Sequence, residues 1–263
     1  MPGAALLGIA ASLFAGAFTG IGGLLVAASG APDARRQNLL IGFAAGVMIA
    51  AAVFSLILPA FAQMRGGGAS LAGAALGVIA AVWLGALAMG RLGHWADGLA
   101  ARGRLPERWG AALGIAQERR IALFIVAITL HNLPEGAAVG ISFMGGDPSL
   151  GWATMFGIGL QNIPEGMAVA ALLASLGWSR SACALAALAT GLVEPLGGAL
   201  AVAVAGLSAA VLPWALGFAA GAMLFVVVAE ILPHTRRQIA HGSATPALMA
   251  GLALMMVLDV TLA

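Results

Sequence analysis

Two hexapeptides of nearly the same sequence carry the side chains that are best suited to bind a cation. His131–Gly136 reads His-Asn-Leu-Pro-Glu-Gly, and Gln161–Gly166 reads Gln-Asn-Ile-Pro-Glu-Gly. In each hexapeptide the first and fifth side chains are four residues apart and project from one face of a helix. Two such helices side by side would bring an imidazole, two carboxylates and amide groups into one small volume. That set of nitrogen and oxygen ligands suits a borderline cation such as zinc better than a hard one.

Each hexapeptide also contains an asparagine and a proline. Asn132 and Asn162 each precede a glutamate by three residues and remain within its reach on a helix. Pro134 and Pro164 each remove a backbone N–H and leave the carbonyl four residues earlier without its helical partner. Such carbonyls are tolerated at membrane depth only where protein or water satisfies them. A further Glu-Pro pair begins at Glu194, so the pattern indicates a polar site rather than packing alone.

The composition indicates a membrane protein. Of 263 residues, 62% are hydrophobic and 8% are charged, whereas a soluble domain is about 25% charged. Continuous apolar runs long enough to cross a bilayer as helices predict an all-α membrane protein with a single transmembrane domain over residues 1–263. The expected spans are at about residues 4–29, 39–62, 71–90, 121–144, 151–175, 181–205, 209–232 and 246–262. A single cysteine, Cys183, excludes a cysteine-rich zinc site.

Half of the ten acidic residues fall within these spans, and no arginine does. The acidic residues in the spans are Glu135, Glu165, Glu194, Glu230 and Asp259. Burying an ionisable group at bilayer depth costs about 3 kcal/mol on insertion scales, so such residues are candidates for a functional site. Because no buried counter-charge is present in the spans, these carboxyl groups require either a bound cation or protonation.

The arginines predict how the chain is oriented. All twelve basic residues are arginine, and eleven lie in the connections that follow the first, third, fifth and seventh spans. Only Arg65 lies on the other side. By the positive-inside rule, the arginine-rich connections, which include a loop at 91–120, are cytoplasmic and both termini are extracytoplasmic. Arginines placed beside apolar spans argue against a nucleic-acid partner.

A second pair of matching segments indicates an internal repeat. Gly42–Met48 reads GFAAGVM, and Gly217–Met223 reads GFAAGAM. In the predicted topology the spans that contain them run in opposite directions, as do the two hexapeptide spans. Similar sequence in oppositely directed helices is typical of inverted-repeat transporters, whose substrate binds near the midplane. The glycines also fit close helix packing of the small-xxx-small type, which is compatible with a repeat.

The two hexapeptides, together with Gly191–Gly197 (GLVEPLG) and the span that begins near Gly42, resemble the ZIP (Zrt-/Irt-like protein) family of metal transporters. The resemblance is to its bacterial GufA-like branch and extends over nearly the whole chain. It implies a 3+2+3 inverted-repeat arrangement of eight transmembrane helices and a homodimer in the bacterial inner (plasma) membrane. It also implies alternating access by an elevator motion, in which the first, fourth, fifth and sixth spans slide against the other four and metal moves toward the cytoplasm.

The resemblance further implies a metal site for one or two ions, with both glutamates bridging if there are two. The ligands of the first ion would be Met48, His131, Glu135, Gln161 and Glu165. The ligands of the second ion would be Asn132, Glu135, Asn162, Glu165 and Glu194. Related binuclear members have Asp where this chain has Asn162, which removes one negative charge from the second site.

We therefore expect a zinc transporter rather than an enzyme, with Cd²⁺, Fe²⁺ and Mn²⁺ as alternative ions. Two other functions compete with this one. An intramembrane metalloprotease would need two histidines in the pattern His-Glu-x-x-His, and only His131 lies in a predicted span. A carrier of protons or organic cations could use the glutamates without a metal, and zinc-dependent thermal stabilisation in detergent would distinguish it from a metal transporter.

Overall fold

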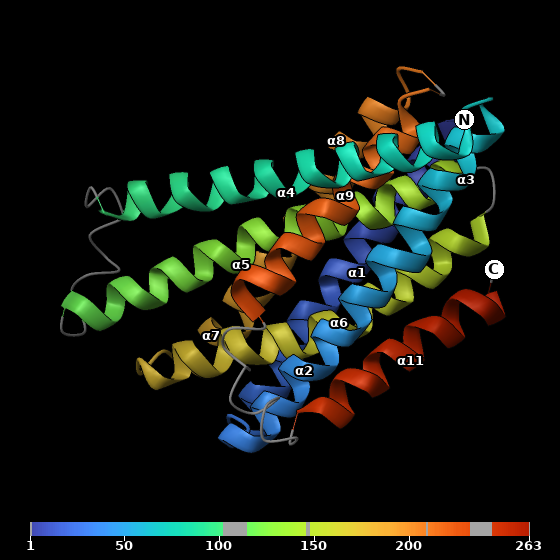
Figure 1. The fold of residues 1–263 in the computed structure, drawn as a ribbon. Helices are drawn as coiled ribbons and strands as arrows, with labels where there is room; N and C mark the ends of the chain where they lie inside the picture. The colour runs from blue at the N-terminus through green and yellow to red at the C-terminus, as the bar shows by residue number, and fades with distance from the viewer. Residues whose placement is uncertain (1, 102–114, 146–147, 209, 232–243, 263) are drawn as a thin grey trace.

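The computed structural model describes residues 2–101, 115–145, 148–208, 210–231 and 244–262 (Figure 1). All regular secondary structure in these ranges is helical, which confirms the predicted all-α class. The longer helices are α1 (Pro2–Ser29), α2 (Ala34–Ala50), α4 (Leu71–Ala101), α5 (Ile115–Ser142), α6 (Pro148–Ser175), α7 (Arg180–Gly191), α8 (Glu194–Ala205), α9 (Leu212–Val226) and α11 (Thr245–Leu262). The shorter ones are η1 (Ala51–Ile57), α3 (Leu58–Gly66), η3 (Phe143–Gly145) and η4 (Val227–Ile231).

The described helices make this a multi-pass membrane protein. Five helical segments are long and apolar enough to cross a bilayer, namely Gly3–Ser29, Arg35–Gly66, Leu71–Leu92, Arg180–Ala205 and Leu212–Ala229. Helix α6 is 28 residues long but is not one of the five, because Gln161, Asn162 and Glu165 lower its mean hydropathy. The helix with the second hexapeptide is therefore less apolar than a helix whose only role is to cross the membrane.

The connection predicted at 91–120 is shorter in the structure. Helix α4 continues to Ala101 and α5 begins at Ile115, and residues 102–114 lie outside the described ranges. The prediction followed the fall in hydropathy after residue 90, which marks where a chain leaves the bilayer and not where a helix ends. Alanine and leucine at 91–101 favour continued helix. With 31 residues, α4 is about 46 Å long and exceeds the roughly 30 Å of a bilayer's hydrocarbon core.

Glycines bring helix backbones into direct contact within a first group of helices. We call α1, α5, α6, α7 and α8 the hexapeptide group, because they pack on one another around the two hexapeptides. Gly16 of α1 faces the backbone carbonyl of Gly191 in α7, and Gly136 of α5 faces the carbonyl of Glu194 in α8. A Cβ atom at either glycine would collide with backbone, so these helices are locked at short separation.

A second group of helices is locked in the same way. We call α2, η1, α3, α4, α9 and α11 the flanking group. Gly46 of α2 faces the carbonyl of Leu248 in α11, and Gly85 of α4 faces the carbonyl of Phe218 in α9. Gly46 belongs to the GFAAGVM segment, so the small-residue pattern of that repeat serves close packing in the structure.

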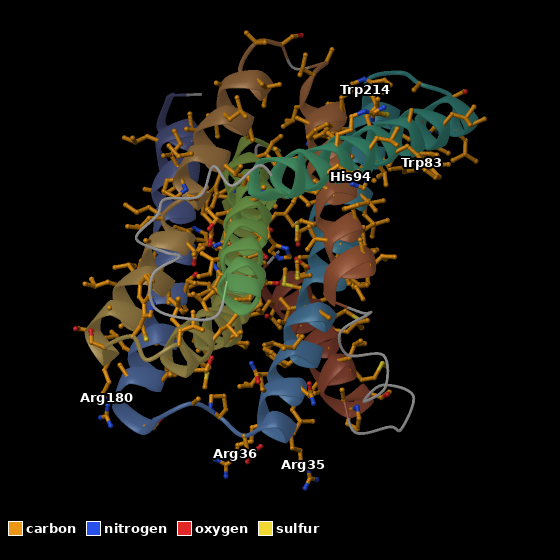
Figure 2. The ribbon with its side chains drawn as sticks, turned by 90° about the vertical axis from the view of Figure 1, so that its left-hand side faces the viewer. Arg35, Arg36, Trp83, His94, Arg180 and Trp214 are labelled. Atoms are coloured by element: carbon orange, nitrogen blue, oxygen red, sulfur yellow. The ribbon has the colours of Figure 1, made fainter. Side chains whose placement is uncertain are left out.

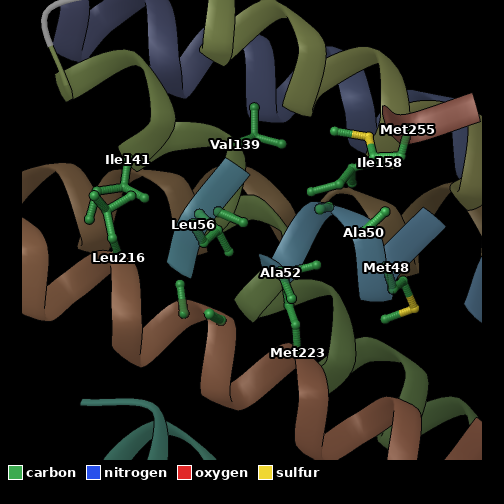
Figure 3. Packing of buried hydrophobic residues seen from close by; sticks show 14 of the residues in the cluster. Met48, Ala50, Ala52, Leu56, Val139, Ile141, Ile158, Leu216, Met223 and Met255 are labelled. Atoms are coloured by element: carbon green, nitrogen blue, oxygen red, sulfur yellow. The ribbon is translucent and has the colours of Figure 1, made fainter. Parts of the chain in front are cut away.

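Large side chains fill the interface between the two groups (Figure 3). Met48 of α2, Met223 of α9 and Met255 of α11 are buried there with Ile158 of α6. Gly157 of α6 lies at the same interface, and the atom nearest to it is the sulfur of Met255 rather than backbone. Each group thus contains close backbone contacts at glycines, whereas these contacts between the groups are made by flexible, polarizable side chains.

Helices α2 and α9 depart from regular α-helix at matching places. Each passes into a short π-helix, η1 or η4, within a few residues of the end of its GFAAG segment. A π-helix has poorer hydrogen-bond geometry than an α-helix and occurs frequently at functional sites. The repeat seen in the sequence thus has a counterpart in the backbone. A further break separates α7 from α8, so that α8 begins at Glu194.

Three of the described arginines lie together at one end of the molecule. Figure 2 shows Arg35, Arg36 and Arg180 together at one end, and Trp214 at the opposite end. In Figure 1 the chain ends marked N and C lie toward the same end of the bundle. These three arginines belong to the eleven that the sequence predicts on one side of the membrane.

Candidate metal site

Helices α5 and α6 pack against each other and bring the polar faces of the two hexapeptides together. Nε2 of His131 is 3.2 Å from Oε1 of Glu135 and 3.5 Å from Oε1 of Glu165. One ligand atom from each of the three residues lies within 4.8 Å of the others. His131 and Glu135 are buried, and the side chain of Glu165 is 12% exposed.

The spacing of these three groups fits one small cation. Zinc holds nitrogen and oxygen ligands at about 2.1 Å, so two ligands of a tetrahedral ion are about 3.4 Å apart. The distances of 3.2 and 3.5 Å from the imidazole nitrogen to the two carboxylates bracket that value. The imidazole nitrogen therefore already has the separation from each carboxylate that two ligands of one zinc ion require, and one ligand atom from each of the three residues lies within 4.8 Å of the others.

Gln161, one turn before Glu165 on α6, is buried against both carboxylates. Its Nε2 donates a hydrogen bond to Oε1 of Glu135 and another, of 3.3 Å, to Oε1 of Glu165. Its Oε1 has no hydrogen-bond partner in the described part of the chain. The amide nitrogen thus lies where a cation would meet the carboxylates, and rotating the amide by a half-turn would present an oxygen ligand instead.

Several buried polar atoms at the site lack a hydrogen-bond partner among the described residues. They are Nε2 of His131, Oδ1 of Asn132, Oε2 of Glu135, Oε1 of Gln161, Oε2 of Glu165 and Oε2 of Glu194. Each buried group left unpaired costs about 1–3 kcal/mol, and native proteins contain few of them. All of these atoms have lone pairs that a cation accepts, so a bound metal ion would remove the cost at several of them together.

The two asparagines point their amide nitrogens away from the space between the carboxylates. Nδ2 of Asn132 donates to the carbonyl oxygen of Thr190, at 2.8 Å. Nδ2 of Asn162 donates to the carbonyl oxygen of Ala15, at 2.9 Å, and to Oε1 of Glu194, at 2.6 Å. A backbone carbonyl only accepts hydrogen bonds, so the contact with Ala15 fixes which end of the Asn162 amide faces α1 and Glu194.

The predicted ligand residues therefore fall into different surroundings. Hydrogen bonds or ion pairs join His131, Glu135, Gln161, Asn162, Glu165 and Glu194 into one buried network. Asn132 lies beside the network and is tied to α7 through Thr190. Met48 is fully buried in the apolar cluster of Figure 3, on the flanking side of the interface.

Another buried polar contact lies outside this network. Oγ of Ser55 in η1 donates to Oδ1 of Asp259 in α11, at 2.9 Å, and Oδ2 of Asp259 has no partner in the described ranges. Both residues belong to the flanking group. The side chain of Glu230, the other acidic residue expected in a span, lies outside the described residues.

Two groups that hold the site in place were not predicted from the sequence. They are the backbone carbonyls of Ala15 in α1 and Thr190 in α7, which accept the amide hydrogens of Asn162 and Asn132. A backbone carbonyl is present at every position and leaves no mark on residue type. The only available signal was the abundance of glycine in α1 and around Gly191, which indicates that other helices approach those backbones closely.

Comparison with known proteins agrees with this geometry. The family model of the ZIP zinc transporters matches residues 111–259, which include both hexapeptides. Zinc transporter GufA of Myxococcus xanthus is 41% identical over 97% of this chain and 98% of its own length. Zinc transporter ZIPB of Bordetella bronchiseptica is 42% identical over 99% of this chain and 82% of its own length.

A more distant relative matches over a similar extent. Zinc transporter ZupT of Stenotrophomonas maltophilia is 30% identical over 94% of this chain and 92% of its own length. The predicted family is thereby confirmed by both the family model and full-length relatives. Because the match covers the polar hexapeptides as well as the helices around them, this chain belongs to the ZIP zinc transporter family.

Proposed function

We propose that this protein carries a divalent transition-metal ion, with zinc as the preferred cargo, across the membrane toward the cytoplasm. The proposal depends on the convergence of His131, Glu135 and Glu165, at a spacing that fits one zinc ion, inside a multi-pass membrane protein. The relatives named zinc transporters support zinc as the ion. Members of this family are transporters, so an intramembrane metalloenzyme is not favoured. Cd²⁺, Fe²⁺ and Mn²⁺ suit the same ligands, and competition in an uptake assay would rank them.

The cargo ion would be bound by four residues of α5 and α6. His131 supplies an imidazole nitrogen, and Glu135 and Glu165 each supply a carboxylate oxygen. Gln161 supplies its amide oxygen after the half-turn described above. Met48 would add a thioether from α2, which makes it the one ligand contributed by the flanking group.

A single ion fits the hydrogen bonds of the network better than two ions do. A second ion would lie between Glu194 and Asn162 and would use Asn132 as well. Both amide hydrogens of Asn162 already bond to Ala15 and Glu194, so this amide occupies the side of Glu194 from which a cation would bind. Coordination there would break two buried hydrogen bonds, each of which contributes about 1 kcal/mol or more.

The two helix groups give alternating access a physical basis. Eight transmembrane helices in a 3+2+3 inverted repeat would place α5 and α6 at the centre, flanked by the two repeats. Backbone contacts through glycine make each group rigid, whereas methionine and leucine side chains line the interface between them. In the proposed motion the hexapeptide group slides along the flanking group and carries the ion with it. The matching π-helices in α2 and α9 support a repeat on the flanking side.

The arginines supply the direction of transport. The end of the molecule with Arg35, Arg36 and Arg180 would face the cytoplasm by the positive-inside rule. Both chain termini would then be extracytoplasmic, and the protein would reside as a homodimer in the bacterial inner membrane. Protease protection of tags in right-side-out and inverted vesicles tests this orientation.

Binding and release follow from the chemistry of the ligands. An incoming ion loses most of its water and displaces protons from ligands that carry them, so uptake is coupled to pH. Release requires a site that is not too tight, because an ion that is held too strongly does not leave. The partly exposed carboxylate of Glu165 is the ligand that water can reach with least rearrangement.

Zinc uptake into proteoliposomes that contain an internal zinc dye tests the proposed site. Glu135→Gln and His131→Ala should each lower the initial uptake rate by roughly tenfold or more, since even residues that only support metal ligands are worth about 10–100-fold. Both variants should also lose zinc-dependent thermal stabilisation. Asp33→Asn removes an exposed carboxylate at the start of α2 and should leave uptake unchanged. Normal uptake in both ligand variants would refute the proposed site.

A further inference from the structure

A large apolar cavity lies between the two helix groups and takes no part in the proposed metal site. Its volume is about 610 Å³, and its walls are α4 and α9 on the flanking side and α5 and α8 on the hexapeptide side. Its lining residues include Leu84, Leu133, Ala201, Val204, Trp214 and Phe218. Apart from the indole N–H of Trp214, the lining side chains in the described ranges carry no hydrogen-bond donor or charge.

The cavity lies at the depth of the bilayer and opens toward it. Three of its walls belong to segments that are apolar and long enough to span a membrane. Several lining side chains also reach the outer surface: Leu84 is 55% exposed, Leu200 is 66% exposed and Phe218 is 44% exposed. The opening therefore faces the hydrocarbon region, where bilayer lipids are the neighbours.

Water is a poor occupant of such a space. A buried water needs two to four polar partners, and a single indole N–H does not supply them. The volume is within the range of about 300–1,000 Å³ that is typical of sites for small apolar ligands. The acyl chains of the surrounding bilayer have the matching chemistry and are present at high concentration.

Charge at one end of the cavity identifies which kind of lipid fits. Arg91 directly precedes Leu92, which is the lining residue nearest the C-terminal end of α4, and the Arg91 side chain is exposed. A guanidinium group there is suited to a phosphate, which it binds through paired hydrogen bonds. Val211 and Trp214 line the cavity at the start of α9, and Figure 2 shows Trp214 at the end of the molecule opposite Arg35, Arg36 and Arg180.

We propose that this cavity binds one acyl chain of a phospholipid, whose phosphate lies at Arg91. The lipid chain would fill the space between the α4–α9 pair and the α5–α8 pair. The site depends on the cavity and on Arg91 alone, so it would exist whichever ion the protein moves.

A phospholipid with a photoreactive diazirine in its acyl chain, incorporated into liposomes with the full-length protein, tests this site. Cross-linked peptides are identified by mass spectrometry. In the wild-type protein we expect labels concentrated on residues that line the cavity from both walls. Labels spread evenly over all exposed apolar faces would overturn the proposal, because they would show only ordinary contact with the bilayer.

Two filling variants and their matched controls make the test specific. Ala201→Phe on α8 and Ala88→Phe on α4 fill the cavity from opposite walls, so the failure of one variant to fold leaves the other. Each should reduce labelling of the cavity residues by roughly tenfold. Ala203→Phe and Ala80→Phe add the same bulk at exposed positions of the same helices outside the cavity and should leave labelling unchanged. Equal labelling of the cavity residues in the filling variants and the controls would overturn the proposal.

The phosphate contact has a separate readout. Arg91→Gln should reduce the amount of phospholipid that remains with the purified protein after detergent washing, measured by native mass spectrometry. Arg180→Gln removes an exposed arginine from another helix and should not change it. Retention that is the same in both variants would contradict a phosphate at Arg91.

Discussion

At the residue scale, the side-chain amide of Asn162 determines which charge lies next to the carboxylate of Glu194, beside the metal site. Its two hydrogens bond to the carbonyl of Ala15 and to the carboxylate of Glu194. The amide thus offers Glu194 a partial positive charge without a metal ion. A carboxylate at the same position would face a carbonyl and a carboxylate, both of which only accept hydrogen bonds, so it would require a cation.

We therefore predict that Asn162→Asp raises the number of zinc ions bound per chain from one to two. In the absence of zinc the variant should be destabilised by about 3–5 kcal/mol, the cost of an unpaired buried charge. Zinc should then raise its melting temperature by more than it raises that of the wild type. Metal analysis after equilibrium dialysis gives the stoichiometry, and thermal unfolding in detergent gives the stability. Asn38→Asp, in α2 near the arginines, serves as the control with no expected change.

Two outcomes would contradict the role given to Asn162. The wild-type protein could bind two zinc ions at saturation, which would mean that the amide turns to coordinate. Alternatively, Asn162→Asp could keep one ion and unaltered stability, which would mean that Glu194 and position 162 do not share a cation.

The sequence predicted the residues at the centre of the site but not what holds them. His131, Glu135 and Glu165 converge as the hexapeptide spacing indicates, because helix geometry fixes which side chains share a face. The partners of the two asparagines are backbone carbonyls of α1 and α7. A backbone carbonyl is present at every residue, so residue type does not indicate which one accepts the bond. Its position depends on how distant segments pack. Sequence alone therefore identifies candidate ligands but does not orient their amides.

At the element scale, glycines determine how closely the helices that carry the site approach each other. Gly136 follows Glu135, and a Cβ atom there would collide with the backbone carbonyl of Glu194. That carbonyl lies at the start of α8 and has little freedom to move. The small-xxx-small pattern predicted close packing in the GFAAG segments, but the partner of each glycine was not evident from sequence.

We predict that Gly136→Ala forces α5 and α8 apart and impairs the metal site, because Gly136 directly follows the ligand Glu135. Overpacking of this kind costs about 1–3 kcal/mol, so the melting temperature should fall and zinc uptake should fall with it. Gly3→Ala, near the start of α1, has nothing within 4 Å of the added Cβ atom and should be neutral or slightly stabilising. The measurements are thermal unfolding by intrinsic fluorescence and uptake by proteoliposomes. Unchanged stability and uptake in Gly136→Ala would show that the backbone contact is looser than the structure indicates.

The ends of the helices show another limit of prediction at this scale. Hydropathy located α1 and the last helix to within a few residues, because a fall in hydropathy and a helix end coincide there. The third span was predicted to end at residue 90, the apolar segment ends at Leu92, and the helix itself continues to Ala101. Hydropathy reports where the chain leaves the bilayer, whereas helix formation continues in water if the residues permit it.

At the scale of the whole molecule, the proposed sliding motion rests on the difference between backbone contacts within each helix group and side-chain contacts between the groups. A link between the groups should stop transport, whereas a link within one group should not. Two pairs of neighbouring residues in the structure allow this comparison. Gln63 of α3, in the flanking group, lies next to Gly145 of η3, which directly follows α5 and packs on the hexapeptide group. Met64 of α3 lies next to Gly77 of α4, within the flanking group.

We predict that a Gln63→Cys/Gly145→Cys pair, joined by a short reducible linker, loses most zinc uptake and regains it on reduction. The Met64→Cys/Gly77→Cys pair, joined in the same way, should transport zinc at the rate of the unlinked protein. Cys183 is buried and would be replaced by serine in both backgrounds. Zinc-dependent thermal stabilisation should persist in the linked Gln63/Gly145 protein, because its metal ligands all lie on one side of the link except Met48. Full uptake while this link is intact would mean that the two groups do not slide past each other, and that the ion crosses a pathway that is fixed in shape.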